Sequence, residues 1–154
     1  MSETGGGRAN QSGRSLEKMV EGLLLGHGYG KVSKREIQKH IIAGEPVFTT
    51  QFLIGQTIYN LDLKIDFFVY HPGKFPDGLI IECKWQQAGG LVDEKYPYLV
   101  ANLLKTQKAA IIVLDGSGYR SGAKRWLEDQ ALKNNKLTVF DLVAFTQWAN
   151  NGNL

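Results

Sequence analysis

Two opposite charges stand inside an otherwise apolar run, LIIECKW, at residues 79–85. Side chains of a strand alternate between its two faces, so Glu82 and Lys84 share one face while Cys83 and Trp85 share the other. Burying such charges is costly unless another group pairs with them or uses them. The run therefore predicts a strand that presents one polar, charged face within apolar surroundings.

The preceding apolar run, KIDFFVY, is also interrupted by an acid, Asp66. If the two strands fold about a turn centred near Lys74, Asp66 lies opposite Glu82. Two carboxylates in a cross-strand pair repel each other, and a divalent cation would reverse that penalty. Oxygen ligands of this kind suit Mg²⁺, which takes one or two carboxylates together with substrate phosphate and water.

Lys84 follows the second acid by two residues, and an ammonium at this position has a chemical use. It could hold the attacking water, favour the deprotonated form of that water, or stabilise the charge that grows on a phosphate. Asp66, Glu82 and Lys84 together therefore indicate phosphodiester hydrolysis.

At these residues the chain resembles the PD-(D/E)XK nuclease superfamily, which includes many restriction enzymes and archaeal Holliday-junction resolvases. The signature is an acid on one strand followed by Glu-x-Lys on the next, and here it is Asp66, fifteen intervening residues, and Glu82-Cys83-Lys84. Ile65, not proline, precedes the first acid. The literal Pro76-Asp77 is only four residues from Glu82, too few for a strand to return, and we interpret it as part of a turn.

The resemblance implies further site residues. Members commonly carry a glutamate on the first helix, and Glu17 occupies the corresponding position. The stretch ECKWQQAGGLVDEKYPY is similar to the run that follows the motif in restriction-like members, which places Gln86 near the site and Lys95 near the substrate. The backbone carbonyl of Cys83 is expected to add a ligand to Mg²⁺, for which Mn²⁺ should substitute.

Three basic residues are candidate contacts to a DNA backbone: Arg14, Lys95 and Arg120. Arg14 lies beside a Gly-rich N-terminal segment, and Arg120 lies in the loop GSGYRSG. For each of them an ordinary solvated side chain is the alternative interpretation. The glycine loop lacks the third glycine of a dinucleotide-binding fingerprint and is expected to be a strand-to-helix turn.

The periodicity of apolar residues predicts an α/β fold with a mixed central β-sheet flanked by α-helices. The resemblance implies that this fold is of the restriction-endonuclease-like type. The expected order is helix, antiparallel strands, helix, strand, helix, strand, helix. Helices are expected at residues 16–26, 33–44, 97–104, 123–132 and 141–149, the last with Asp141 as its N-cap. Strands are expected at residues 47–55, 57–70, 79–86, 109–115 and 137–140.

Composition limits the alternatives. A chain of 154 residues that is 43% hydrophobic can close one sizeable core, so we expect a flexible arm at residues 1–12 and a single domain at residues 13–154. One cysteine excludes an internal disulfide, and no apolar run is long enough to span a membrane. These features predict a cytoplasmic protein, and the resemblance implies that it comes from a prokaryote or phage. The three histidines are scattered, which argues against a zinc site.

The sequence thus favours a Mg²⁺-dependent endonuclease that cuts double-stranded DNA, sequence-specific in the manner of restriction or homing enzymes. Cutting both strands needs two sites, so a homodimer or homotetramer is expected. A Holliday-junction resolvase or another structure-specific repair nuclease is the alternative within the class. Outside it, the alternative is a DNA-binding module without catalysis; a small-molecule enzyme would need a cofactor motif that the sequence lacks.

Overall fold

A mixed sheet forms the centre of the molecule. The computed structural model describes the backbone of residues 5–86, 93–116 and 121–154. Within these residues the sheet contains six strands, and their order across the sheet is their order along the chain. The strands β2, β3 and β4 run antiparallel to one another, whereas β1 is parallel to β2 and the β4, β5 and β6 strands are mutually parallel. This is the mixed α/β sheet that the sequence predicts.

The strands are β1 Gly30–Lys31, β2 Val47–Gln56, β3 Asp62–His71, β4 Phe75–Trp85, β5 Ala109–Asp115 and β6 Leu137–Phe140. The helices are α1 Gly5–Gly26, α2 Ile37–Ile42, α3 Tyr96–Lys105, α4 Ser121–Lys133 and α5 Leu142–Trp148, with a short 3₁₀ turn at Asp93–Lys95 and a π turn at Ala149–Asn153. Among the described residues, none of the helices combines the length and the apolar character that crossing a membrane requires.

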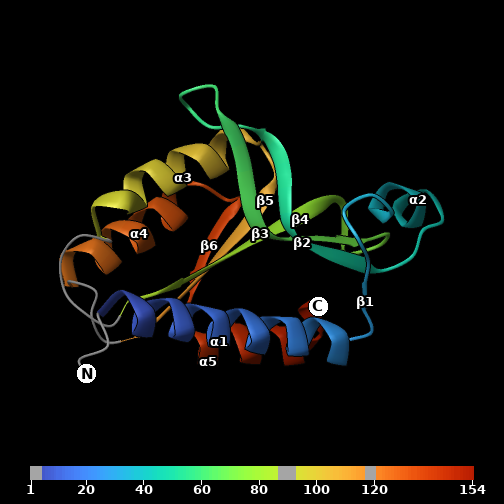
Figure 1. Cartoon of the computed structure of the whole chain (residues 1–154), viewed down its shortest axis with the longest axis horizontal. Helices are drawn as coiled ribbons and strands as arrows, with labels where there is room; N and C mark the ends of the chain where they lie inside the picture. Colours follow the sequence, from blue (N-terminus) through green and yellow to red (C-terminus); the bar gives the residue numbers. More distant parts are fainter. Residues whose placement is uncertain (1–4, 87–92, 117–120) are drawn as a thin grey trace.

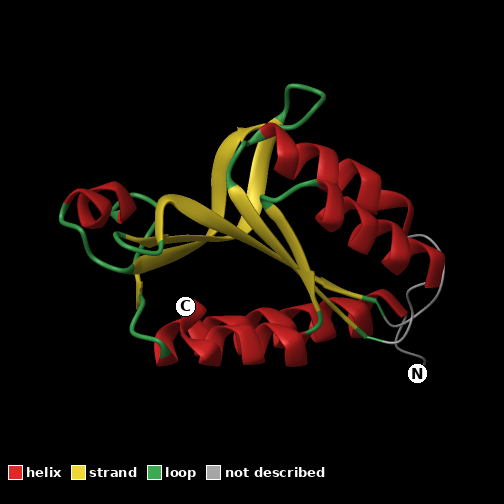
Figure 2. Ribbon diagram, turned by 180° about the vertical axis from the view of Figure 1, so that it is seen from behind, coloured by secondary structure: helices red, strands yellow, loops and turns green. Residues whose placement is uncertain are grey.

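The helices cover the sheet in two layers (Figures 1 and 2): α1 and α5 lie on one face, and α3 and α4 lie on the other. Leu16, Val20 and Leu24 recur every four residues on α1, which places them on one side of the helix, and all three are buried against the sheet. Leu103 of α3 and Leu127 of α4 bury the opposite face. Two separate apolar cores therefore sandwich the strands.

The register of the β3–β4 hairpin is the one that the sequence predicts. Phe67 pairs with Ile81, and Val69 pairs with Leu79. Continuing this register by one residue brings Asp66 beside Glu82. The alternation of faces thus carries both acids to the same end of the hairpin.

The hairpin β2–β3 bends sharply halfway along its length (Figure 1). Residues two apart in a strand normally share a face, yet Phe67 belongs to the core beneath α1 while Ile65 belongs to the core beneath α3. Across the hairpin, Phe48 and Phe52 are divided between the two cores in the same way. Between them stands Gln51 in the left-handed region, with φ 51°. The alternation of side chains between the two faces therefore shifts by one residue at Gln51 in β2. The same shift occurs at Asp66 in β3.

Several boundaries differ from the sequence-based expectation, most of all the starts of α1 and β3. Helix α1 begins at Gly5, within the segment expected to be a flexible arm, because helical hydrogen bonds propagate cooperatively from the anchored apolar part. The strand expected from residue 57 begins only at Asp62. Before it, the hydroxyl of Thr57 accepts the backbone N–H groups of Tyr59 and Leu61, which closes a turn.

Pro76 and Asp77, which we interpreted as part of a turn, lie instead in the first residues of β4. A register irregularity between Val69 and His71 of β3 falls opposite them. Proline is tolerated near the start of a strand and beside such irregularities, where the missing N–H breaks no ladder bond. The dipeptide is in the strand but far along it from Glu82.

Other local predictions are confirmed. Pro97 occupies the first turn of α3, and the bounds of β5 and β6 are those expected from their apolar runs. Asp141 caps α5, since its side chain accepts the backbone N–H of Ala144 at 2.7 Å.

Gly116 should be the least replaceable of the described glycines. Its φ is +101°, and a Cβ there would lie 2.3 Å from the backbone oxygen of Gln86. Gly116→Ala should therefore destabilise the fold by more than ~2 kcal/mol, through backbone strain and steric overlap together. Gly44→Ala is the matched control, because Gly44 also has a positive φ, +73°, but open space around it. Urea unfolding of both variants checks this; equal losses would contradict the close approach.

Candidate active site

Two crossed hydrogen bonds join Asp66 to Glu82 and to Cys83 at the end of the β3–β4 hairpin. The backbone N–H of Asp66 donates to Oε1 of Glu82 at 3.0 Å, and the backbone N–H of Cys83 donates to Oδ2 of Asp66 at 2.8 Å. The last ladder pair before this point is Phe67 with Ile81. Beyond it, side-chain carboxylates bind the N–H groups of the opposite strand.

Lys84 completes this group from β4. Its Nζ lies 3.5 Å from Oε2 of Glu82. The Glu82 side chain is only 6% exposed, whereas that of Lys84 is 35% exposed. The ammonium therefore stands between a buried carboxylate and solvent, where it can also contact a bound molecule. The three residues that the sequence singled out lie together.

The negative charge of Asp66 disfavours ionisation of Glu82. Burial first, and then the negative charge of Asp66, raise the pKa of Glu82 to about 8, while the Lys84 ammonium acts in the opposite direction. With no cation to offset it, the second charge is costly in this cluster.

Helix α1 brings Glu17 to the same place. Burial, the charge of Asp66 and a hydrogen bond with the Asp66 side chain all raise the pKa of Glu17, and the positive charges of Lys84 and Arg14 lower it. Glu17 therefore belongs to the acidic cluster, and the exposed Arg14 lies near it. Glu21, one turn further on, instead pairs with Lys31 at 2.5 Å.

A cleft of about 430 Å³ opens beside Glu82 and Lys84. The start of β3 forms one wall, and α3 with the residue before it forms the other. Lys95 is exposed at this wall, so a third predicted residue faces the same cleft as the Glu-x-Lys pair. The remaining lining residues are Thr57, Asp62, Leu63, Lys64, Tyr96, Tyr98, Leu99, Asn102 and Leu103.

Comparison with protein families agrees with this geometry. A family model described as a PD-(D/E)XK nuclease superfamily domain matches residues 8–153. The chain belongs to the PD-(D/E)XK nuclease superfamily. Membership implies nuclease activity in general, and nucleases of this superfamily generally use divalent metals. Neither the curated proteins nor the solved structures compared with the chain gave a match.

Other predicted residues of this nuclease domain lie in different surroundings. Gln86 is buried at the end of β4, where its Oε1 accepts the hydroxyl proton of Tyr96 at 2.6 Å. This bond ties β4 to α3 and keeps the amide out of the cleft lining. The Cys83 side chain packs in the core beneath α1, and burial raises the pKa of its thiol far above the usual range. Arg120 lies outside the described residues.

Gln51 is a neighbour of the site that the sequence analysis missed. Its Nε2 donates to Oδ1 of Asp66 at 3.4 Å, a long hydrogen bond. A non-glycine residue in the left-handed region is uncommon inside a strand. Only the pairing of β2 with β3 brings Gln51 opposite Asp66, and no motif in the sequence marks it.

The donor set fits a divalent cation bound mainly by substrate and water. Among the residues described in the structure, no three His, Cys, Asp or Glu side chains form a closed metal cage. Mg²⁺ needs no such cage, since one or two carboxylates with phosphate and water complete its shell. Asp66 and Glu82 supply the two carboxylates, and the cost of charging both, visible in the raised pKa of Glu82, is the cost that a cation would remove.

The metal-free protein should lose stability as pH rises. The pKa of Glu82 is about 8 in the fold, against 4.5 for the free group, so between these values the folded state holds a proton that the unfolded state has released. Stability then falls from about pH 5 to pH 8. The side chain of a Glu82→Gln variant cannot ionise. The free energy of unfolding of this variant should therefore exceed that of the wild type by on the order of 2 kcal/mol at pH 8.5.

Thermal unfolding in a chelator at pH 5.5 and pH 8.5 checks this difference. Glu128→Gln, at an exposed carboxylate on α4, is the control and should follow the wild type at both values. A Glu82→Gln protein that is no more stable than the wild type at pH 8.5 would contradict the repulsion between the acids.

Proposed function

We propose that this chain is a Mg²⁺-dependent endonuclease that cleaves double-stranded DNA at Asp66, Glu82 and Lys84. The observation that carries the proposal is the crossed pairing of the two acids, with the Lys84 ammonium 3.5 Å from Glu82. Two paired carboxylates and an ammonium, of which Glu82 and Lys84 line a cleft, match the needs of phosphodiester hydrolysis, in which charge must be neutralised and a water must be positioned.

In this proposal Asp66, Glu82 and the backbone carbonyl of Cys83 hold the cation. A divalent cation would supply a Lewis acid that polarises the phosphate and neutralises its growing charge. The bond that forms joins the water oxygen to phosphorus, and this water gives up a proton to solvent. The bond that breaks joins phosphorus to a sugar oxygen, which takes up a proton from solvent and leaves as an alcohol.

Lys84 performs the positioning step. Its partly exposed ammonium donates a hydrogen bond to the attacking water and holds the oxygen lone pair toward phosphorus. Glu17, on the other side of Asp66, helps to orient the same water. Glu82 remains buried beneath them, and its contact with Lys84 fixes the lysine side chain.

A sequence-specific enzyme on duplex DNA is the form of this function that we favour. Its support is the similarity of the segment from Glu82 to Lys95 to the run found in restriction-like members. Cleavage of both strands then needs two copies of the site, in a homodimer or a homotetramer. The same chemistry on a four-way junction would make the chain a resolvase.

Cleavage of a mixed set of DNA tests the proposal. Phage genomic DNA, supercoiled plasmid and a synthetic four-way junction are incubated with Mg²⁺ and the wild type, Asp66→Ala or Lys84→Ala. Both variants should lose at least ~100-fold in rate, a typical effect of removing one stabilising group. Lys84→Ala should still bind the cation, whereas Asp66→Ala should bind it weakly, because Asp66 is a proposed ligand and Lys84 is not.

Lys133→Ala is the control, since this exposed lysine lies at the end of α4, away from the cluster. It should cut as the wild type does. Full cleavage by Asp66→Ala or Lys84→Ala would contradict the assignment of the site. DNA that is bound equally by all variants and cut by none would favour a binding module over an enzyme.

A further inference from the structure

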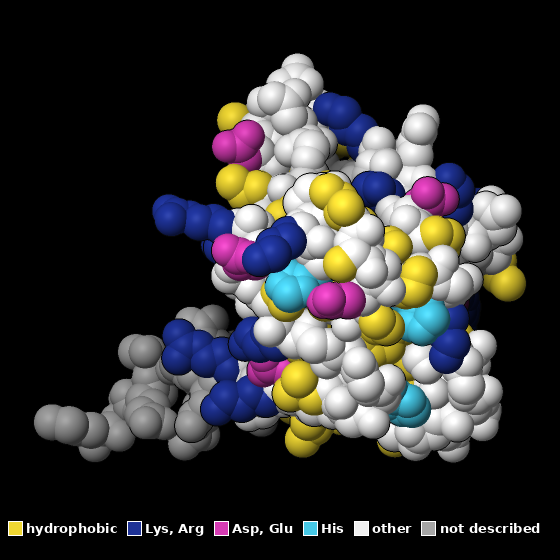
Figure 3. Space-filling model, turned by 90° about the vertical axis from the view of Figure 1, so that its right-hand side faces the viewer, with side chains coloured by type: hydrophobic (Ala, Val, Ile, Leu, Met, Phe, Trp, Pro, Cys, Tyr) yellow, Lys and Arg dark blue, Asp and Glu magenta, His cyan; other side chains and the backbone are white. Residues whose placement is uncertain are grey.

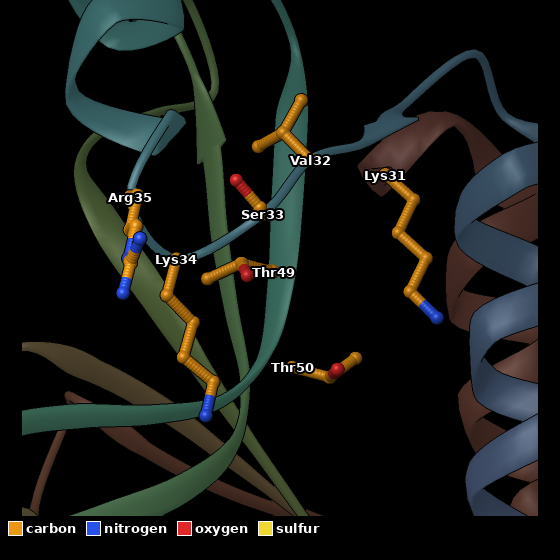
Figure 4. Close-up of a pocket in the computed structure, with 7 residues that line it drawn as sticks. All are labelled: Lys31, Val32, Ser33, Lys34, Arg35, Thr49 and Thr50. Carbon is orange, nitrogen blue, oxygen red and sulfur yellow. The ribbon is translucent and has the colours of Figure 1, made fainter.

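A second hollow, of about 480 Å³, lies beside strand β2, outside the cleft described above. Figure 4 shows Thr49 and Thr50 of β2 between two groups of basic side chains. The Lys31 side chain stands on the side toward α1, and Lys34 and Arg35 stand on the opposite side. Val32 and Ser33 complete the lining. We refer to these seven residues as the basic groove.

The basic groove has a surplus of positive charge. Lys34 and Arg35 are exposed, and within the described part of the chain neither has an acidic partner at salt-bridge distance. Lys31 is paired with Glu21 of α1, yet its side chain is 50% exposed. Figure 3, which looks at this side of the molecule, shows Lys and Arg side chains gathered toward its left edge. An anion entering the groove would meet cations on both sides.

The groove adjoins the acidic cluster through β2. Thr50 pairs with Phe67, and the next residue along β2, Gln51, donates to Asp66. From Thr49 to Gln51 the strand advances by roughly 7 Å. The groove therefore stands close enough to Asp66 for one bound DNA strand to contact both.

We propose that the basic groove binds the phosphodiester backbone of duplex DNA on one side of the scissile phosphate. This inference rests on the proposed function, and it adds the path of the substrate. The charges are spread along the groove on separate side chains, which suits a chain of successive phosphates better than one small anion. Lysine and hydroxyl side chains supply backbone contacts, which position DNA without reading its sequence.

The double variant Lys34→Ala/Arg35→Ala tests the groove. Binding of a fluorescent 30-base-pair duplex is measured without divalent cation, across a series of salt concentrations. Each lost phosphate contact should reduce the magnitude of the slope of log affinity against log salt by about 0.9. For the double variant the magnitude of this slope should therefore fall by about 1.8. At low salt its affinity should fall by roughly tenfold or more. Both side chains are exposed, and thermal unfolding verifies that the fold is kept.

Arg125→Ala/Lys133→Ala is the matched control. It removes one exposed arginine and one exposed lysine from α4, so it changes the net charge equally but leaves the groove intact. The proposal is supported if this control keeps the salt slope of the wild type while the groove variant has a reduced slope. The wild-type slope in the groove variant, or the same loss in both double variants, would overturn it.

Failure of the groove and failure of the proposed function give different results. If the wild type cleaves DNA with Mg²⁺ but the groove variant binds duplex normally, the function stands and the groove is refuted. If the groove variant loses binding but the wild type cuts no DNA with Mg²⁺ or Mn²⁺, the groove stands as a DNA-binding surface and the nuclease proposal is refuted.

Discussion

The crossed hydrogen bonds between Asp66 and the β4 segment at Glu82 and Cys83 are the contact on which the site depends. In an ordinary hairpin these N–H groups would bind backbone carbonyls, but here each binds a carboxylate of the opposite strand. The exchange satisfies the buried N–H groups and fixes both acids in place. It also keeps two negative charges close together, and burial beside Asp66 raises the pKa of Glu82 to about 8. In the proposed function, a bound cation would offset this energetic cost.

The bend in the β2–β3 hairpin places Asp66 at the boundary between the two cores. Phe67 and Ile65 pack in opposite cores, so the strand changes faces at Asp66. A regular strand would carry Asp66 into one of these cores, where a charged carboxylate is expensive. Gln51, with φ 51° and a hydrogen bond to Asp66, sits at the same bend on the neighbouring strand. Irregular backbone at this point is consistent with the tendency of strain to collect at functional sites.

Much of this fold could be predicted from the sequence because its signals are local. The apolar runs of β5 and β6, Pro97 at the start of α3 and the cap at Asp141 each follow from residue type and spacing. The register of the hairpin, and with it the meeting of Asp66 and Glu82, follows from alternation about one turn. The family match over residues 8–153 agrees with this outcome.

What could not be predicted depends on contacts between distant segments. The left-handed backbone of Gln51 and the shift in the alternation of faces arise from packing between two cores. No residue type in the segment QFL, residues 51–53, predicts either feature. The basic groove joins the segment after α1 to β2, and only this tertiary contact sets Lys31, Lys34 and Arg35 beside Thr49 and Thr50. The most direct test of the account is a calorimetric titration of Mn²⁺ into the wild type, Asp66→Asn and Glu82→Gln. We predict one saturable site in the wild type and at least tenfold weaker binding in both variants; equal affinity in all three proteins, or no binding by the wild type, would contradict the account.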